Sequence, residues 1–284
     1  MSDKFKSVRW VFDCASWKPT YSDLLFATSC IQHEEKERID KFVFQKDVKS
    51  SLIGRLMMRK YISEVTNKTW NDIMIFRDIN GKPYYKHNDL QLNFNISHQG
   101  RFTVLAGEIG EVELGVDIMK REYTGGKKVE DFFRIMGRSF ANEEWQAIRE
   151  SPIEKKQINN FFRFWCLKES YVKATGTGIT VDLQKIRFKL NSETIENNKF
   201  VDDTVVFVDS VKQNNWIFQE TLLLEDHCTA VALLFKNNSD KNKLFLQEKF
   251  TFVNFKELME NASVILNEDR LFCDNFFKKD VEPY

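Results

Sequence analysis

The chain has 284 residues, of which 42% are hydrophobic and 14% aromatic, with only 11 Gly and 4 Pro. This composition supports a large buried core and excludes a disordered or low-complexity protein. Lys plus Arg and Asp plus Glu both number 42, so the chain lacks the basic excess typical of a nucleic-acid-binding protein.

The five cysteines are scattered and contain no C-x-x-C pair, so we expect neither a disulfide framework nor a zinc site. The N-terminal segment lacks the apolar stretch of a signal peptide. No apolar run is long enough to cross a membrane. We therefore expect a cytoplasmic protein of the reducing cytosol, with no membrane partner and no nucleic-acid partner.

The first part of the chain predicts a strand, a long helix and a pair of extended segments. Val8–Phe12 is the strand, and Gln32–Val65 is the helix, whose acidic beginning suits a helix N-terminus. Apolar residues recur at helical spacing in the second half of that segment. Asn80–Pro83 is a turn signal between the two extended segments.

Residues 90–119 predict a meander of three strands, because apolar and polar residues alternate along them. Ser97–Gly100 is expected to form the turn after the first of these strands. In the third strand, Val116 and Ile118 lie on the face opposite Asp117.

The second part repeats this plan after a polar linker at Lys120–Lys128. Asn142 is a plausible N-cap for a short helix. Phe161–Thr175 predicts a long helix that ends at Gly176. The strands expected after it are Ile186–Leu190, Val205–Val208, Trp216–Gln219 and Thr229–Phe235.

These patterns predict an α+β fold that is pseudo-duplicated, with two similar halves, each a long helix packed on an antiparallel sheet. The halves are residues 1–120 and 121–240, and an aromatic-rich extension at 241–284, after a loop at Asn237–Asn242, is expected to pack over the fold. A cleft between the halves would be the natural ligand site.

One helix carries charged residues on an otherwise apolar surface. Trp165, Glu169 and Lys173 are spaced i, i+4 and i+8 and share a face. A Glu and a Lys in such a helix must either pair with each other or serve a ligand. Spacing alone leaves an ordinary surface ion pair open.

Two segments together favour a ligand site over an ordinary surface ion pair. Gly115-Val-Asp-Ile118 and Trp165-Cys-Leu-Lys-Glu-Ser-Tyr-Val-Lys-Ala174 resemble the paired signature, G-[IV]-D and W-x-x-K-E-[SA]-x-x-K, of the 4′-phosphopantetheinyl transferase superfamily. The resemblance is to its monomeric duplicated class, in particular the animal type named for priming aminoadipate-semialdehyde dehydrogenase. Gly81–Pro83 and Asn95–Gln99 resemble its coenzyme A-binding segments, in the same order.

The resemblance implies a magnesium-dependent transferase that moves phosphopantetheine from coenzyme A to a serine of an apo carrier protein. Asp117 and Glu169 would hold Mg²⁺, Glu169 would also act as general base, and Lys173 would neutralise charge on the pyrophosphate. Many bacterial relatives have a third carboxylate where this chain has Met119, and a thioether is a poor ligand for a hard cation. Gln99 is the candidate third ligand, with a plain turn residue as the alternative.

Coenzyme A would be held by residues in both halves. By resemblance these are Arg38, Arg77, Lys82, Asn95, Ser97, His98, Glu169 and Lys173. The alternatives are that His98 is an ordinary polar turn residue, Arg38 a charge on a solvated helix face, and Arg77 a strand-end cation. Lys168 is expected to contact either the ligand or solvent, and Arg55 and Arg59 to be structural or solvent-facing.

The implied partners are acyl carrier proteins and carrier domains, including those of fatty-acid synthase and an aminoadipate-reducing enzyme, and the chain is expected to be a monomer. Two other classes remain as competitors. One is a non-catalytic scaffold that binds carriers or coenzyme A, and the other is a Mg²⁺-dependent nucleotide pyrophosphate hydrolase. The intact Asp117, Glu169 and Lys173 argue against the scaffold, and the tryptophan-containing signature argues against the hydrolase.

Overall fold

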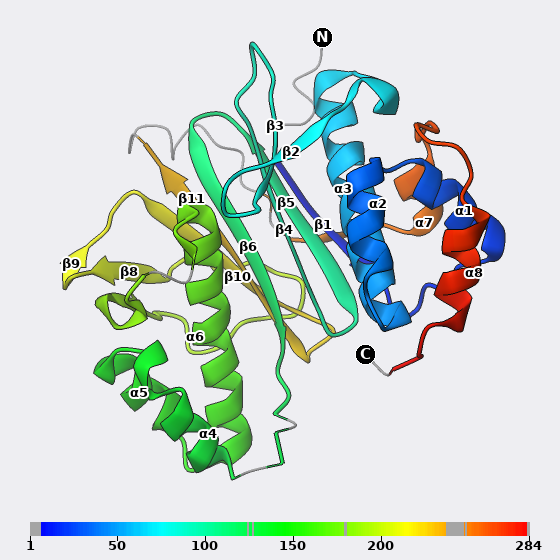
Figure 1. Cartoon of the computed structure of the whole chain (residues 1–284). Coiled ribbons are helices and arrows are strands. Elements are labelled where there is room, and N and C mark those ends of the chain that lie inside the picture. Colours follow the sequence, from blue (N-terminus) through cyan, green and yellow to red (C-terminus); the bar gives the residue numbers. More distant parts are fainter. Residues whose placement is uncertain are drawn as a thin grey trace. The chain divides into compact units, whose positions relative to one another are not determined.

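The computed structural model of the chain describes residues 7–123, 125–126, 128–178, 181–236, 247 and 249–282. The chain forms two compact units (Figure 1). Unit 1 comprises Met1–Gly110 and Phe250–Tyr284, and unit 2 comprises Glu111–Lys249.

Unit 1 is built on a four-stranded sheet with the order β12-β1-β5-β4, against which the long helix α3 packs. Strand β5 is antiparallel to both β1 and β4, and β12 is parallel to β1. The elements of unit 1 are β1 (Ser7–Asp13), α1 (Tyr21–Ser29), α2 (His33–Asp40), α3 (Gln45–Thr66), η1 (Trp70–Asp72), β2 (Ile75–Arg77), β3 (Pro83–Tyr85), β4 (Leu92–Gln99), β5 (Phe102–Ile109), β12 (Thr251–Phe252), α7 (Phe255–Met259) and α8 (Arg270–Lys278).

Unit 2 is built on a three-stranded antiparallel sheet with the order β10-β11-β6, and helix α6 packs against β6 and β11. A smaller sheet has the order β7-β8-β9. The elements of unit 2 are β6 (Val112–Lys120), α4 (Val129–Ile135), η2 (Gly137–Ser139), α5 (Asn142–Arg149), α6 (Glu154–Thr175), η4 (Leu183–Lys185), β7 (Ile186–Lys189), β8 (Val205–Val208), β9 (Val211–Lys212), β10 (Trp216–Leu223) and β11 (His227–Phe235).

The two units share one topology. In unit 1, the first strand, β1, pairs with β5, and β5 pairs with β4, the strand that precedes it in sequence. In unit 2, the first strand, β6, pairs in the same way with β11, and β11 pairs with β10. The long helices α3 and α6 both have 22 residues and both end at a left-handed residue, Asn67 and Gly176 respectively. The predicted fold class, α+β with two similar halves, is confirmed.

The helix predicted at Gln32–Val65 is interrupted. Helix α2 ends at Asp40 and α3 begins at Gln45, so the prediction of one continuous helix was wrong. Lys279, just after α8, donates from Nζ to the main-chain oxygens of Asp40 and Phe42, each at 2.8 Å. Helix α2 can therefore end here, because the tail binds carbonyl groups at its C-terminal end.

The turn predicted at Ser97–Gly100 lies further along the chain. Strand β4 continues to Gln99, which pairs with Phe102 in β5. The connection is therefore Gly100–Arg101, with Gly100 in the left-handed region that a two-residue hairpin requires. His98 and Gln99 are exposed residues at the end of a strand rather than turn residues.

The structure differs from the sequence-based expectations in the pairing of β6 and in the position of the boundary between the units. Strand β6 is not the third strand of a meander with β4 and β5, because it pairs with β11 in unit 2. The units thus divide at Gly110, whereas the sequence placed residues 111–120 in the N-terminal half.

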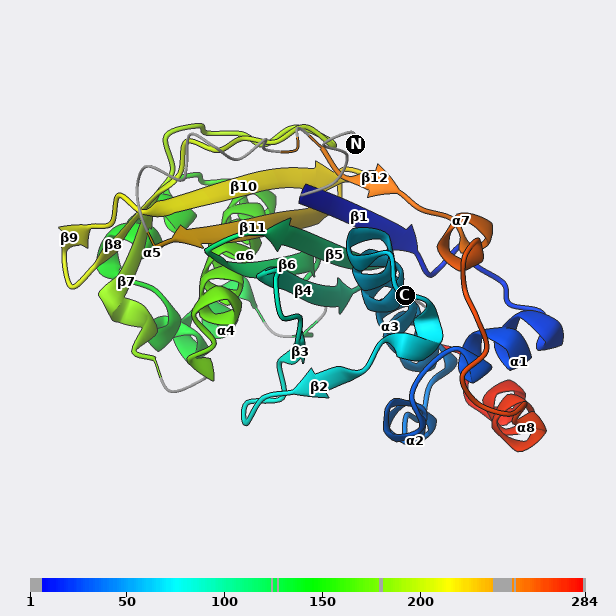
Figure 2. The same cartoon turned by 90° about the horizontal axis from the view of Figure 1, so that it is seen from above.

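The C-terminal segment is part of the core of unit 1. Helices α7 and α8 contact α3, and α8 also contacts α1 (Figure 2). Buried members from this segment include Val253, Leu258, Met259, Phe272, Cys273 and Phe276. The predicted loop at Asn237–Asn242 lies outside the described residues. Among the helices that the structure describes, none has the length and apolarity needed to cross a membrane.

Candidate active site

The site in unit 2 begins with a close approach between β6 and α6 at Gly115. A Cβ atom placed on Gly115 would lie 2.1 Å from the main-chain oxygen of Ser170 and 2.4 Å from the main-chain nitrogen of Ala174. Any larger residue would therefore displace the helix from the strand. Ser170 and Ala174 are themselves small and buried, so the backbones of helix and strand meet almost directly.

This contact places Asp117 beside Lys173. Asp117 lies two residues after Gly115, so both face the same side of β6. Lys173 Nζ lies 2.6 Å from Asp117 Oδ1 and also donates to the main-chain oxygen of Val116 at 3.2 Å. Asp117 is buried, whereas the Lys173 side chain is 29% exposed, so the pair can be reached from solvent on the lysine side.

Glu169 lies one helical turn before Lys173 and within electrostatic reach of Asp117. Burial and the negative charge of Asp117 raise the pKa of Glu169, while the positive charge of Lys173 opposes this rise. Two carboxylates and one ammonium group therefore form a single cluster on β6 and α6. Two like charges held together in a partly buried position would be stabilised by a divalent cation.

The donor set of this cluster fits Mg²⁺. This ion takes oxygen ligands, commonly one or two carboxylates with the rest from substrate phosphates and water. Asp117 and Glu169 supply two such carboxylates. Across the described residues, no group of three or more His, Cys, Asp and Glu side chains is arranged to hold a metal. Met119 packs at the edge of the hydrophobic cluster of unit 2.

Lys168 is a buried, paired residue, contrary to the expectation that it contacts the ligand or solvent. Its Nζ is 2.8 Å from Glu144 Oε2 and donates to the main-chain oxygens of Leu183, at 2.8 Å, and Ile186. The side chains of Lys168 and Glu144 are 1% and 0% exposed. Lys168 therefore ties α6 to α5 and to the segment that begins β7.

Glu144 was missed by the sequence analysis. Its other hydrogen bonds come from the main-chain nitrogens of Ala141, at 2.8 Å, and Phe188, at 2.9 Å. The available signal was an acidic residue in the first turn of a helix, which usually indicates only a cap. Asn142, the predicted N-cap, is instead the first helical residue, and Ala141 precedes it.

Trp165 and Cys166 complete the packing behind the cluster. The Trp165 ring lies 6.1 Å from the rings of both Phe140 and Phe161, measured between centroids. Cys166 Sγ donates to the main-chain oxygen of Asp117 at 3.2 Å. Burial raises the pKa of this thiol well above its usual range, so it remains protonated and serves as a donor.

In unit 1, the predicted cation Arg77 binds a carboxylate that the sequence analysis did not consider. Its Nε and Nη2 donate to the two oxygens of Glu35, each at 2.7 Å, and its Nη1 donates to the main-chain oxygen of Gly81, also at 2.7 Å. Lys82 follows Gly81 directly in the sequence. The hydrogen bond from Arg77 to Gly81 therefore links the end of β2, which carries Arg77, to the turn that carries Lys82.

The other unit 1 candidates lie on α2 and β4. Arg38 is exposed on α2. Asn95 and Ser97 are buried on one face of β4, and His98 and Gln99 are exposed at its end. The predicted ligand residues of unit 1 therefore divide between a group near Glu35 and a group along β4.

Comparison with known proteins assigns this chain to a family. A sequence model described as "4'-phosphopantetheinyl transferase, N-terminal" matches residues 15–110, and one described as "4'-phosphopantetheinyl transferase superfamily" matches residues 113–232. The chain is 40% identical over 283 residues to the L-aminoadipate-semialdehyde dehydrogenase-phosphopantetheinyl transferase of Homo sapiens. The aligned region covers 95% of this chain and 91% of that protein. The chain belongs to the 4′-phosphopantetheinyl transferase superfamily.

Other relatives agree with this assignment. The Xenopus laevis L-aminoadipate-semialdehyde dehydrogenase-phosphopantetheinyl transferase is 38% identical over 286 residues, 98% of this chain and 94% of that protein. A phosphopantetheinyl transferase of Thraustochytrium is 32% identical over 230 residues, 79% of this chain and 77% of that protein. The resemblance inferred from the motifs is confirmed, as is the enzyme class, a transferase.

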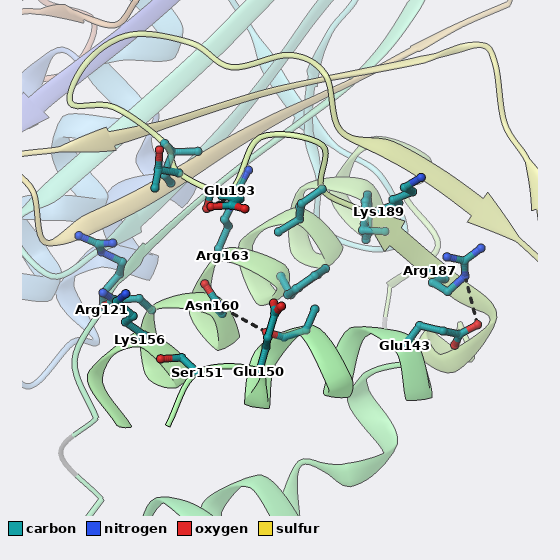
Figure 3. A pocket seen from close by; sticks show the side chains of 17 residues that line it. Arg121, Glu143, Glu150, Ser151, Lys156, Asn160, Arg163, Arg187, Lys189 and Glu193 are labelled. Carbon is teal, nitrogen blue, oxygen red and sulfur yellow. Dashed lines mark hydrogen bonds and ion pairs between the residues drawn. The ribbon is translucent and has the colours of Figure 1, made fainter. Parts of the chain in front are cut away.

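Within this phosphopantetheinyl transferase chain, a cavity of about 650 Å³ lies elsewhere in unit 2, among α5, α6 and β7 (Figure 3). Basic side chains line it, including Arg121, Lys156 and Arg187, together with acidic ones such as Glu143 and Glu150. Asp117, Glu169 and Lys173 do not line it. The carboxylate cluster is thus a separate feature of unit 2.

Proposed function

We propose that the chain transfers 4′-phosphopantetheine from coenzyme A to a serine of an apo carrier protein and releases adenosine 3′,5′-bisphosphate. The observation that carries this proposal is the cluster of Asp117, Glu169 and Lys173, in a chain of this superfamily. Transfer of a phosphoryl group between oxygens depends mainly on positioning and on neutralising charge, which these residue types can supply.

Glu169 would act as the general base. The serine proton passes to its carboxylate, directly or through a water, as serine Oγ forms a bond to the β-phosphorus. The bond from that phosphorus to the bridging oxygen breaks, and its electron pair leaves on adenosine 3′,5′-bisphosphate. A raised pKa suits a base at neutral pH, and such a base is typically worth roughly 10²–10⁴-fold in rate.

Lys173 would neutralise charge on the pyrophosphate as it breaks, while its contact with Asp117 fixes its position. Bound Mg²⁺ would supply charge neutralisation at the phosphate oxygens. Asp117 and Glu169 would hold it, with Gln99 as the third protein ligand in place of the carboxylate that Met119 replaces. Arg38, Arg77, Lys82, Asn95, Ser97 and His98 would hold coenzyme A.

We further propose that the chain acts as a monomer in the cytosol. The names of the human and Xenopus relatives specify an aminoadipate-semialdehyde dehydrogenase as the protein modified. A carrier domain of that kind, and the carrier of fatty-acid synthase, are accordingly the substrates proposed for this chain.

The test is to incubate the purified chain with coenzyme A, Mg²⁺ and an apo acyl carrier protein and to weigh the carrier by mass spectrometry. Gain of one phosphopantetheine on the carrier is the expected result. Free pantetheine phosphate with an unmodified carrier would instead identify a hydrolase, and no product of either kind would favour a binding scaffold.

A further inference from the structure

Glu35 lies at the centre of a group of basic side chains in unit 1. It is 6% exposed and comes from helix α2. Its carboxylate accepts from Arg77 Nε and Nη2, each at 2.7 Å, and from Arg55 Nε at 2.5 Å. One carboxylate thus holds two guanidinium groups, one from strand β2 and one from helix α3.

The orientation of Arg77 is fully specified by these contacts. All three of its side-chain nitrogens have acceptors within the protein, because Nη1 also donates to the Gly81 main-chain oxygen. Among the hydrogen bonds of the described residues, these three leave one N–H on each terminal nitrogen for a further acceptor, since a guanidinium group carries five such donors in a planar fork. That geometry suits a phosphate group, which guanidinium groups bind through paired hydrogen bonds.

The group is positively charged despite its central carboxylate. Burial lowers the pKa of Arg55, as do the charges of Arg77 and Arg38, while Glu35 opposes them. Burial alone would raise the pKa of Glu35, but the hydrogen bonds and charges of Arg77 and Arg55 lower it, so the carboxylate stays ionised. Arg77 and Arg55 surround the Glu35 carboxylate, and Arg38 lies within electrostatic reach of Arg55, so the group keeps a net positive charge that favours an anion.

A second set of contacts holds the supporting elements in place. Arg59, one turn after Arg55 on α3, donates from Nη1 to the main-chain oxygens of Trp70, at 2.7 Å, and Ile73, at 3.1 Å. Gln32 Oε1 accepts from the main-chain nitrogen of Ile75 at 2.7 Å. The segment that leads into β2 is therefore anchored to α3, and the first residue of β2 to the residue before α2, independently of Glu35.

We propose that Glu35 is a positioning residue, which fixes Arg55 and Arg77 as one preorganised cluster for a phosphate group of coenzyme A. This inference rests on the proposed function, because it takes coenzyme A as the ligand. Glu35 does not contact the ligand. It determines how the two arginines meet it.

Substitution of Glu35 by Gln tests the inference, because charge and orientation predict opposite changes in the Kd for coenzyme A. The change removes a negative charge from a cationic site, so charge alone predicts tighter binding of a polyphosphate anion. Loss of orientation predicts weaker binding instead. We expect the Kd for coenzyme A, measured by isothermal titration calorimetry, to rise about tenfold or more, because small misplacements of bidentate arginine clamps are costly.

Kinetics provide a second readout. Since the cluster would bind the donor equally before and during transfer, we expect Glu35→Gln to raise KM for coenzyme A with little change in kcat. Glu37→Gln is the matched control, because Glu37 is on the same helix, is exposed, and pairs only with His33 among the ion pairs of the described residues. This control should leave both Kd and KM unchanged.

Arg55→Lys covers the case in which Glu35→Gln does not fold. It keeps the positive charge but loses the planar fork, so weaker coenzyme A binding is again expected. If Glu35→Gln folds and binds coenzyme A as tightly as wild type or more tightly, the inference is overturned, provided that the wild-type chain binds coenzyme A and transfers. If Glu35→Gln does not fold, the same result in Arg55→Lys overturns it. Failure of the wild-type chain to bind coenzyme A would reject the proposed function itself.

Discussion

Glu169 takes up a proton more readily in the folded chain than a free glutamate does, because burial and the charge of Asp117 raise its pKa more than Lys173 lowers it. The folded state therefore favours the protonated form. Its contribution to stability is present below the ordinary glutamate pKa of about 4.3 and is lost as pH rises through the raised value. A partly buried carboxylate with a raised pKa is therefore expected to cost stability at neutral pH.

This reasoning gives a prediction on pH. In the absence of Mg²⁺, the free energy of unfolding of Glu169→Gln should increase relative to wild type as pH rises from 4 to 7, because the amide does not ionise. Urea unfolding at several pH values measures this difference. Transfer activity should be lost in the variant. A constant difference in stability across the range would show that the Glu169 pKa is unshifted.

Lys168 leads to a second prediction, on stability. Replacing it by Met leaves Glu144 buried without its counter-ion, and breaking a buried ion pair typically costs about 3–5 kcal/mol. Denaturant unfolding should show a loss of that size. The double variant Lys168→Met with Glu144→Gln should recover part of it, since no unpaired charge remains. Full activity and stability in Lys168→Met would contradict the assignment of Lys168 as a buried structural residue.

At the scale of elements, the backbone contact at Gly115 determines whether β6 and α6 bring their charged residues together. Gly115 allows the strand to approach Ser170 and Ala174, and Asp117 and Lys173 meet as a consequence. The buried Lys168–Glu144 pair holds the same helix from another side. The cluster of Asp117, Glu169 and Lys173 is thus supported by one close contact and one ion pair.

We predict that Gly115→Ala will destabilise the chain by about 1–3 kcal/mol, the usual cost of overpacking, and reduce transfer, because the added methyl group pushes α6 away from β6. Thermal unfolding and the carrier mass assay measure these two effects. Gly137→Ala is the control, since a Cβ there has no neighbour within 4 Å among the described residues and its backbone is not in the left-handed region. Equal behaviour of the two variants would refute the steric argument.

At the scale of the whole molecule, unit 1 is assembled from both ends of the chain. Strand β12 pairs with β1, the Phe255 ring stacks on Trp17 at 4.9 Å between centroids, and α7 and α8 contact α3. The C-terminal extension, which was expected to pack over the fold, is therefore part of the core of unit 1. Its removal would expose apolar surface that no other described element covers.

We predict that a chain ending after Lys249 will lose the cooperative unfolding of unit 1, because the core loses several fully buried side chains. Circular dichroism during heating and binding of a hydrophobic dye would detect this loss. A chain ending after Asp280 keeps α8 and Lys279 and should unfold as the full chain does. A native-like melting curve for the shorter chain would contradict the assignment of residues 250–280 to the core.

Much of the architecture was predictable from local patterns. Alternating apolar residues identified β4, β5 and β6, and helical periodicity identified the second half of the α2–α3 segment. The sequence analysis also placed α6 and β11. The order of the motifs was enough to identify the superfamily. The break between α2 and α3 was not predictable, because the groups that bind the end of α2 come from Lys279, far along the chain.

The sequence alone determined the fold class and the superfamily, and the resemblance implied that Asp117 shares a site with the helix that bears Glu169 and Lys173. Only the tertiary structure decided that Lys168 is a buried partner of Glu144 and that Glu35 holds Arg55 and Arg77. The physical reason is that periodicity reports which face of an element is buried. The partner of a buried charge is set by contacts between residues distant in sequence, here 42 positions apart for Glu35 and Arg77.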